Sequence, residues 1–189
     1  MGRFLLAVAL SAAALLGQDF KLGVRVDAFT LRDASGSAVE FSALRGPVTV
    51  VTFVATRCPV SNSYNDRMNA IYKEYGERGV KFIFVNANQT EPLAEVAEHA
   101  KEHFGFPVYK DQNDVVADRF GASVTPESFV IDSTGVIRYH GSIDDSMAVQ
   151  RVRENRLREA LDAVLAGKRV ERAETKAFGC SIKRDRKPS

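Results

Sequence analysis

One stretch of the chain limits its fold more than any other. The run VTVVTFV (Val48–Val54) consists of β-branched residues and one phenylalanine, without the polar alternation of a half-exposed strand. Such a run is typical of a strand that is buried on both faces. After this strand, apolar residues recur at helical spacing from Val60, which predicts one helix ending near Gly76. A second run, VKFIFVNAN (Val80–Asn88), then predicts a second buried strand. This alternation predicts an α/β domain, with a central sheet covered by helices on both faces.

The segments on either side continue the alternation. Apolar residues alternate around the turn sequence DASGS, which predicts a β-hairpin between Phe29 and Phe41. Downstream we expect a helix over 93–104, a short strand at FPVY, a helix over 115–120, two strands about a Ser-Thr-Gly turn, and a last helix ended by Gly167. The charged remainder lacks sustained periodicity. The sequence therefore predicts one domain over residues 19–166 and an extended C-terminal tail over 167–189.

The N-terminus has the layout of a secretory signal peptide. MGRFLLAVALSAAALLGQ places Arg3 before an apolar run from Phe4 to Leu16, followed by small and polar residues. At about 13 residues, this run is shorter than the roughly 20 that a membrane-spanning helix needs. We expect residues 1–18 to be removed and the mature protein to reside in the periplasm or to be secreted; an uncleaved membrane anchor is the alternative. No other segment is apolar enough to suggest a membrane partner.

Charge and cysteine content narrow the function classes. The formal net charge is +2, and no cluster of Lys and Arg is interleaved with aromatic residues, which argues against nucleic acid as a partner. The chain has two cysteines, Cys58 and Cys180. In an oxidising compartment such a pair can persist as a disulfide, whereas in the cytosol both would mostly be thiols.

Cys58 follows the first buried strand in the sequence ATRCPVS. Pro59 suits the first position of a helix, so the sulfur of Cys58 would face unpaired N–H groups at the positive end of that helix. If this placement lowers the thiol pKa by about one unit, the fraction of thiolate at neutral pH rises about eightfold. Each thiolate becomes about threefold less nucleophilic, so placement alone raises the reactivity about two- to threefold. Exposure and orientation of the sulfur are the larger benefits. An inert buried cysteine is the alternative.

Two neighbours of Cys58, Arg57 and Ser61, are candidate substrate-positioning residues. Arg57 adds positive charge beside the thiolate, an effect that exposure to solvent reduces. Ser61 lies one helical turn after Cys58. Either it is only a polar residue at a helix start, or it donates a hydrogen bond to the thiolate.

Three motifs, FVATRCPVSNSY, VTPESFVID and ETKAFGCSIKR, occur in this order and together resemble the thioredoxin-like redoxins. Among these, the chain is most similar to exported AhpC/TSA-type peroxiredoxin-like proteins, over about residues 20–183. The resemblance implies a thioredoxin fold with an N-terminal β-hairpin extension and a C-terminal extended tail. It also implies that Pro126 is a cis-proline beside the catalytic sulfur, which turns the backbone of Thr125 toward a substrate strand. A trans proline that merely opens a strand is the alternative.

The sequence departs from the family patterns at three positions. Thioredoxins carry a second cysteine where this chain has Ser61. Typical peroxiredoxins carry Pro-x-x-x-Thr-x-x-Cys, and here the proline and threonine positions hold Val51 and Ala55. These departures argue against efficient peroxidase chemistry and leave Cys180 as the second thiol.

Cys180 is the candidate resolving thiol. About 13 residues separate it from the end of the last predicted helix, a reach of up to roughly 45 Å, and a domain of this size is about 40 Å across. The tail can therefore return Cys180 to Cys58. Cys58 would then attack as the nucleophile, and Cys180 would resolve the mixed disulfide or sulfenic acid. The alternative is a permanent structural disulfide, which for a closed loop of more than about 100 residues contributes about 4 to 5 kcal/mol to the stability of the fold.

These patterns lead to three functional hypotheses. The first is an exported thiol-disulfide oxidoreductase whose partners are a protein disulfide or small thiol substrate and a thiol reductant. The second is a thiol-dependent peroxide reductase, and the third is a non-catalytic binding module with a structural Cys58–Cys180 disulfide. No cofactor is implied, because the electrons pass through sulfur.

Other polar residues have simpler interpretations. His99 and His103 share a helix face without an identifiable third ligand, so we expect a solvated surface and no metal site. Asp144 and Asp145 precede the last predicted helix, where carboxylates cap free N–H groups. Glu127, next to Pro126, is a candidate proton relay for Cys58, although its charge would also oppose a thiolate.

Overall fold

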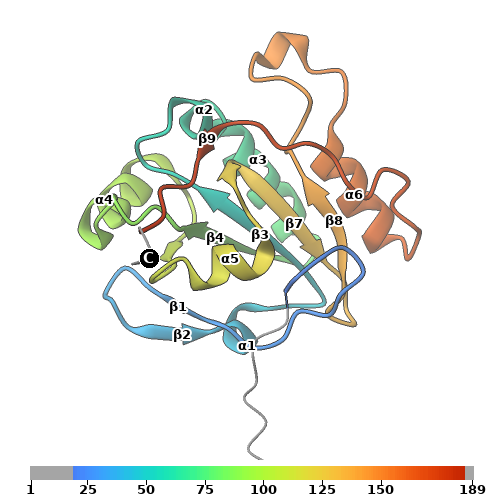
Figure 1. Ribbon diagram of the computed structural model, residues 1–189. Coiled ribbons are helices and arrows are strands. Elements are labelled where there is room, and N and C mark those ends of the chain that lie inside the picture. The colour runs from blue at the N-terminus through green and yellow to red at the C-terminus, as the bar shows by residue number, and fades with distance from the viewer. Residues whose placement is uncertain (1–18, 186–189) are drawn as a thin grey trace, which may run out of the picture.

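The computed structural model describes residues 19–185; the predicted signal peptide at residues 1–18 lies outside the described residues. The domain is built on a seven-stranded sheet with the order β2-β1-β5-β4-β3-β7-β8 (Figure 1). Its strands are β1 (Thr30–Arg32), β2 (Ala38–Glu40), β3 (Val48–Val54), β4 (Val80–Asn86), β5 (Val108–Lys110), β7 (Glu127–Ile131) and β8 (Ile137–Gly141). The predicted α/β domain and its N-terminal hairpin are confirmed.

Strand β3 lies in the interior of the sheet, with a partner strand on each side. It runs parallel to β4 and antiparallel to β7, and each of its residues is buried. Neighbouring side chains of a strand point to opposite faces of its sheet, and Val50 and Val51 accordingly belong to two different apolar clusters. This double burial explains why the run from Val48 to Val54 shows no polar alternation.

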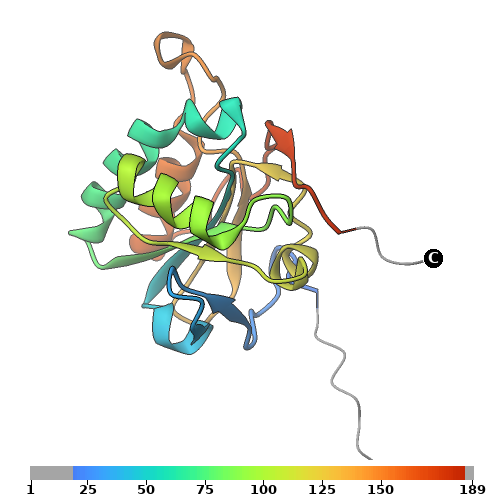
Figure 2. The same cartoon turned by 90° about the vertical axis from the view of Figure 1, so that its left-hand side faces the viewer.

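Helices cover both faces of the sheet, as predicted (Figure 2). One face packs against α3 (Asn65–Gly76), α4 (Leu93–His103) and α6 (Arg156–Leu165), and the other against α1 (Phe41–Leu44) and α5 (Val115–Phe120). A short 3-10 helix, η1 (Val149–Arg151), lies in the loop between β8 and α6. Within residues 19–185, no helix combines the length and the apolar character needed to span a bilayer.

The helix predicted from Val60 to Gly76 is divided in two, so this prediction is wrong in its continuity. A short helix, α2 (Pro59–Asn62), ends before Ser63, and α3 begins at Asn65. Tyr64 between them is only 1% exposed, and its hydroxyl donates a hydrogen bond to Asp144 Oδ1 at 2.8 Å. The break lets Tyr64 reach a partner in a distant loop, which helical periodicity cannot reveal.

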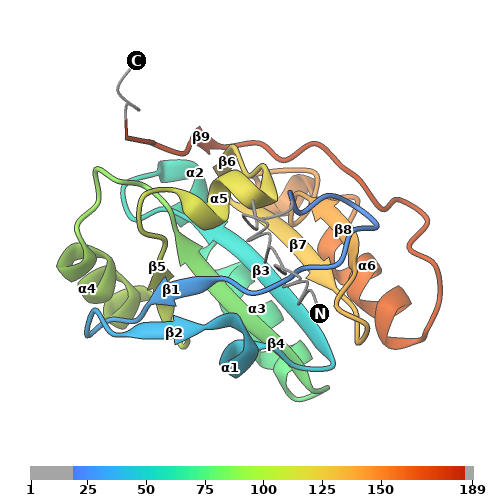
Figure 3. The ribbon, with the colours of Figure 1, turned by 60° about the horizontal axis from the view of Figure 1, so that its bottom comes forward.

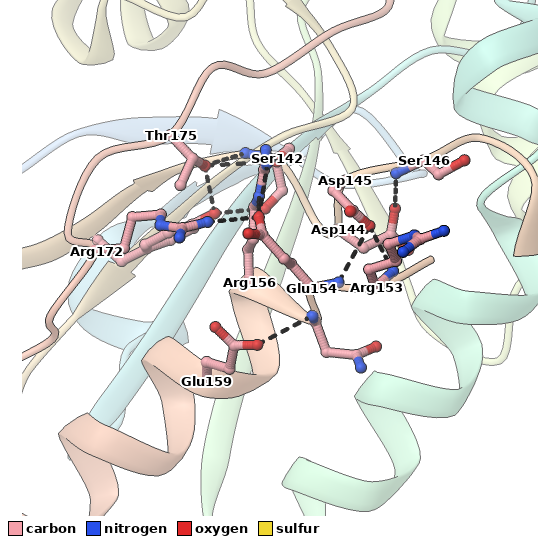
Figure 4. A network of polar contacts seen from close by, with 12 residues as sticks. Ser142, Asp144, Asp145, Ser146, Arg153, Glu154, Arg156, Glu159, Arg172 and Thr175 are labelled. Carbon is pink, nitrogen blue, oxygen red and sulfur yellow. Dashed lines mark hydrogen bonds and ion pairs between the residues drawn. The ribbon is translucent and has the colours of Figure 1, made fainter. Parts of the chain in front are cut away.

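The tail is extended and returns to the domain, as predicted. After α6 it runs along the edge of β8, where Thr175 Oγ1 forms a hydrogen bond with the hydroxyl of Tyr139 at 2.8 Å. The same oxygen accepts the N–H of Ser142 at 3.1 Å (Figure 4). Its last part forms strand β9 (Cys180–Ser181), antiparallel to β6 (Val124–Thr125). Figures 1 and 3 show this strand beside the start of α2. The tail thus connects the far edge of the sheet to the end of β3.

Asp144 does not cap α6, which corrects the prediction made for it. Its Oδ2 atom accepts a hydrogen bond from the Arg67 guanidinium at 2.6 Å, so it ties α3 to the loop after β8. Asp145 accepts the N–H groups of Arg153 and Glu154 at 2.9 and 3.2 Å, in the turn that precedes α6 (Figure 4). The two adjacent carboxylates therefore have different roles, one across the fold and one local.

Candidate redox site

Cys58 lies where the sequence predicts it, at the turn between β3 and α2. It occupies the N-cap position of α2, with Pro59 at the first helical position. The backbone N–H of Ser61 donates a hydrogen bond to Cys58 Sγ at 3.3 Å. A free N–H group at a helix start stabilises negative charge on an atom that accepts from it. Cys58 is only 4% exposed, however, so the sulfur is covered in this state.

The two cysteines form a disulfide. Cys58 and Cys180 are 122 residues apart in sequence, and their Cα atoms are 5.9 Å apart. Cys180 is partly exposed, with exposed residues Gly179 and Ser181 on both sides of it. The tail therefore covers Cys58, and Cys180 is the more exposed of the two cysteines.

Thr125 and Pro126 adjoin this disulfide. The Thr125–Pro126 peptide bond is cis, as the family resemblance implies. The carbonyl oxygen of Thr125 lies 3.6 Å from Cys58 Sγ, and Thr125 pairs with Cys180 in the β6–β9 register. A Cβ atom on Gly179 would lie 1.9 Å from this carbonyl oxygen, so only glycine permits the tail to approach so closely. Thr125 thus contacts both sulfur-bearing segments.

Ser61 and Arg57 are near Cys58 but have other partners. The Ser61 hydroxyl oxygen accepts the Ala55 N–H at 3.1 Å, and the backbone N–H of Ser61 is the group that faces the sulfur. The Arg57 guanidinium pairs with Glu95 of α4, with Nε donating to Oε1 at 2.7 Å. This pairing offsets the positive charge of Arg57. The roles of Ser61 and Arg57 in positioning a substrate stay predictions.

Glu91 is a site residue that the sequence patterns did not single out. It is 3% exposed, and its carboxylate accepts the backbone N–H groups of Thr56 and Arg57, each at 2.9 Å. These are the two residues immediately before Cys58. An acidic residue in the short loop between a buried strand and a helix was the available signal, but nothing local connects it to Cys58.

Glu127 is engaged away from the sulfur. One carboxylate oxygen accepts the N–H groups of Ser123 and Val124 at 2.7 and 3.2 Å, and the other lies 2.5 Å from His140 Nε2. The imidazole of His140 stacks on Phe129. The His140–Glu127 pair supports the turn before the cis-proline, and a proton-relay role for Glu127 has no contact with Cys58 to support it.

The two helical histidines lie side by side, with His99 and His103 ring centroids 4.5 Å apart. Burial, followed by the neighbouring His103, lowers the pKa of His99. Over residues 19–185, no three His, Cys, Asp or Glu side chains are grouped so as to hold a metal ion.

Comparison with known proteins places this geometry in a family. The model of the AhpC/TSA family matches residues 22–140, which include β3, Cys58 and the cis-proline. The chain belongs to the AhpC/TSA family. The match ends before the tail, so Cys180 lies outside it.

Individual proteins and structures are also similar to this AhpC/TSA protein. The chain is 31% identical over 122 residues to a thiol-disulfide oxidoreductase ResA from Halalkalibacterium halodurans, and the match covers 63% of this chain and 68% of the relative. A crystal structure of a hypothetical protein from Sinorhizobium meliloti superposes with a TM-score of 0.79 and 30% identity, covering 89% of this chain and 97% of that one. The crystal structure of the peroxidoxin BcpB from Mycobacterium tuberculosis superposes with a TM-score of 0.61 and 25% identity, covering 79% of this chain and 99% of that one. The predicted thioredoxin-like fold and oxidoreductase class are confirmed.

Proposed function

We propose that this protein is an exported thiol-disulfide oxidoreductase in which Cys58 is the nucleophile and Cys180 the resolving thiol. The observation that carries the proposal is the disulfide between the N-cap cysteine of α2 and the tail, directly beside Thr125 and the cis-proline. Similarity to ResA supports exchange between thiols and disulfides as the reaction. The apolar N-terminal run with its early Arg3 supports export.

The proposed cycle consists of two exchange steps. The Cys58 thiolate attacks a sulfur of the substrate disulfide, forming a mixed disulfide and releasing the other substrate sulfur as a thiolate. The Cys180 thiolate then attacks Cys58 Sγ, so the Cys58–Cys180 bond forms and the second substrate sulfur leaves. A thiol reductant returns the pair to two thiols, and because Cys180 is the more exposed partner, it is the sulfur that this reductant reaches.

The Ser61 N–H group assists both directions of this exchange. It donates to Cys58 Sγ in the disulfide, and the same donor would stabilise the thiolate after the bond opens. A more stable thiolate is a better leaving group, so a reductant that attacks Cys180 releases Cys58 readily. Substrates would approach through the Thr125 backbone, which β9 occupies while the disulfide is closed.

Trapping of substrates with Cys180→Ser tests the proposal. Without the resolving thiol, the second step cannot occur, so mixed disulfides should accumulate on Cys58. Non-reducing gels followed by mass spectrometry of periplasmic or secreted proteins would identify the captured partners, and the Cys58→Ser, Cys180→Ser double variant is the matched control. Absence of any adduct on Cys58, with the fold intact, would contradict the proposed nucleophile.

The reduction potential of the Cys58–Cys180 pair distinguishes a catalytic disulfide from a permanent structural one. We expect a value between about −270 and −120 mV for the mature protein, the range of thiol-disulfide oxidoreductases. A value well below about −300 mV is typical of structural disulfides in exported proteins. Equilibration with dithiothreitol and glutathione buffers, followed by alkylation and mass measurement, gives this potential.

Peroxide reduction is the second candidate function, and the similarity to a peroxidoxin favours it. Val51 and Ala55 occupy the positions where typical peroxiredoxins carry proline and threonine. The two functions are separated by the consumption of hydrogen peroxide with a thiol donor. A rate no faster than that of free cysteine excludes this second function.

A further inference from the structure

One buried polar cluster lies between the two sulfur-bearing segments. It consists of Asn86, Asn88, Glu91 and Lys110, at the ends of β4 and β5, and each of these residues is buried. The Lys110 ammonium donates hydrogen bonds to Asn86 Oδ1 at 2.9 Å and to the Asn88 carbonyl oxygen. The Asn86 amide donates to Glu91 Oε2 at 2.5 Å. These contacts fix the side chains of the cluster relative to one another.

The cluster is attached to the Cys58 segment through Glu91. Its two carboxylate oxygens hold the N–H groups of Thr56 and Arg57, at the end of the turn that leads into Cys58. The side-chain amide of Asn62 donates to the Thr56 carbonyl at 2.9 Å and closes the same turn from the other side. The backbone next to the nucleophile is therefore held by contacts that do not involve its sulfur.

The cluster is attached to the Cys180 segment through Asn88. Asn88 Oδ1 accepts the N–H of Lys183 at 2.7 Å, and the N–H of Gln89 donates to the Lys183 carbonyl at 2.8 Å. The preceding residue, Ile182, is 6% exposed in an apolar cluster, and its N–H bonds the Ser123 carbonyl at 3.0 Å. None of these contacts involves a sulfur, so opening of the disulfide does not by itself remove them.

We propose that Asn88 is a positioning residue for the resolving step. It keeps Lys183 on the domain while the disulfide is open, so that Cys180 stays within reach of a mixed disulfide on Cys58. A tail already held in place loses less conformational entropy on ring closure than a free tail does, which raises its effective concentration. The inference rests on the proposed function: the Cys180 thiol loses its proton to solvent, its sulfur bonds Cys58 Sγ, and the substrate sulfur leaves as a thiolate.

The equilibrium of the Cys58–Cys180 pair with glutathione tests this role, because it measures the effective concentration of one thiol toward the other. Asn88→Ala is expected to lower this value about three- to tenfold. Tenfold corresponds to the loss of one whole hydrogen bond, and the loss is smaller if the contacts of Ile182 and Gln89 keep the open tail partly docked. Asn88→Asp retains the acceptor oxygen and should stay within about twofold of the wild type. Lys183→Pro removes the donor N–H from the exposed tail and should reproduce the effect of Asn88→Ala.

A second measurement separates the tail from the nucleophile. In the Cys180→Ser background, Asn88→Ala should raise the rate of Cys58 alkylation by iodoacetamide, because a loosened tail covers the sulfur less. The pH dependence of that rate should stay unchanged, because the Ser61 N–H and the turn held by Glu91 remain in place. The proposal is overturned if Asn88→Ala and Lys183→Pro both leave the glutathione equilibrium unchanged, or if the pH dependence of Cys58 alkylation shifts, which would place the effect on the nucleophile and not on the tail. If Asn88→Ala does not fold, Lys183→Pro alone decides. Neither measurement needs a protein substrate, so this outcome is independent of the trapping experiment.

Discussion

Replacement of Cys58 by serine is expected to reduce the turnover of disulfide substrates at least about a thousandfold. The nucleophile of exchange is a thiolate, and a serine hydroxyl neither ionises near neutral pH nor forms a mixed disulfide. Serine is also a favoured N-cap residue, so the start of α2 should persist in the variant. The measurement is steady-state reduction of a disulfide-bonded protein substrate with glutathione as electron donor.

Cys180→Ser is the matched control for this loss. It removes the same disulfide and one sulfur but keeps the nucleophile, so it should complete the first step and then accumulate a mixed disulfide. Equal turnover in the wild type and Cys58→Ser would instead support the hypothesis of a binding module whose disulfide only fixes the tail. The contrast between the two serine variants therefore separates loss of the nucleophile from loss of the cross-link.

Much of the fold was predictable because its strongest signals are local. The buried run from Val48 to Val54 and the helix over 115–120 are properties of short windows, and the structure confirms both. The break at Ser63 was not predictable in this way. It depends on a hydrogen bond from Tyr64 to Asp144, residues in distant parts of the chain, and no periodicity carries that information.

The same contrast between local signals and distant contacts applies to the candidate site. The turn at Cys58, the cis-proline at Pro126 and the return of Cys180 follow from motifs and from the length of the tail. Glu91 and Asn88 were missed because they act on backbone groups of segments far away in sequence, and a side chain that bonds a distant backbone leaves no motif. Sequence patterns thus located the sulfurs, and only the fold revealed what holds them in place.

Removal of the Asp144 carboxylate is expected to lower the free energy of unfolding by about 3 to 5 kcal/mol. The Asp144 side chain is 4% exposed, and its partner Arg67 is 15% exposed. In Asp144→Ala the guanidinium would lose its counter-charge, and the Tyr64 hydroxyl would lose the carboxylate acceptor that it now bonds. For a chain of this length, the midpoint of thermal unfolding should fall by about 6 to 20 °C, as measured by circular dichroism.

Two substitutions test whether the pair itself produces this loss. Asp145→Ala removes an adjacent carboxylate that accepts only backbone N–H groups of the loop, so it should cost about 1 kcal/mol or less. Asp144→Asn retains an acceptor for Tyr64 without the charge and should fall between the two alanine variants. The ring centroids of Tyr64 and Phe178 lie 6.2 Å apart, so Tyr64 contacts the tail that covers Cys58. Loss of Asp144 should therefore loosen the tail and expose Cys58 to alkylation after reduction. A loss in Asp144→Ala no larger than that in Asp145→Ala would mean that the ion pair contributes little, and that packing alone holds Tyr64 beneath the tail.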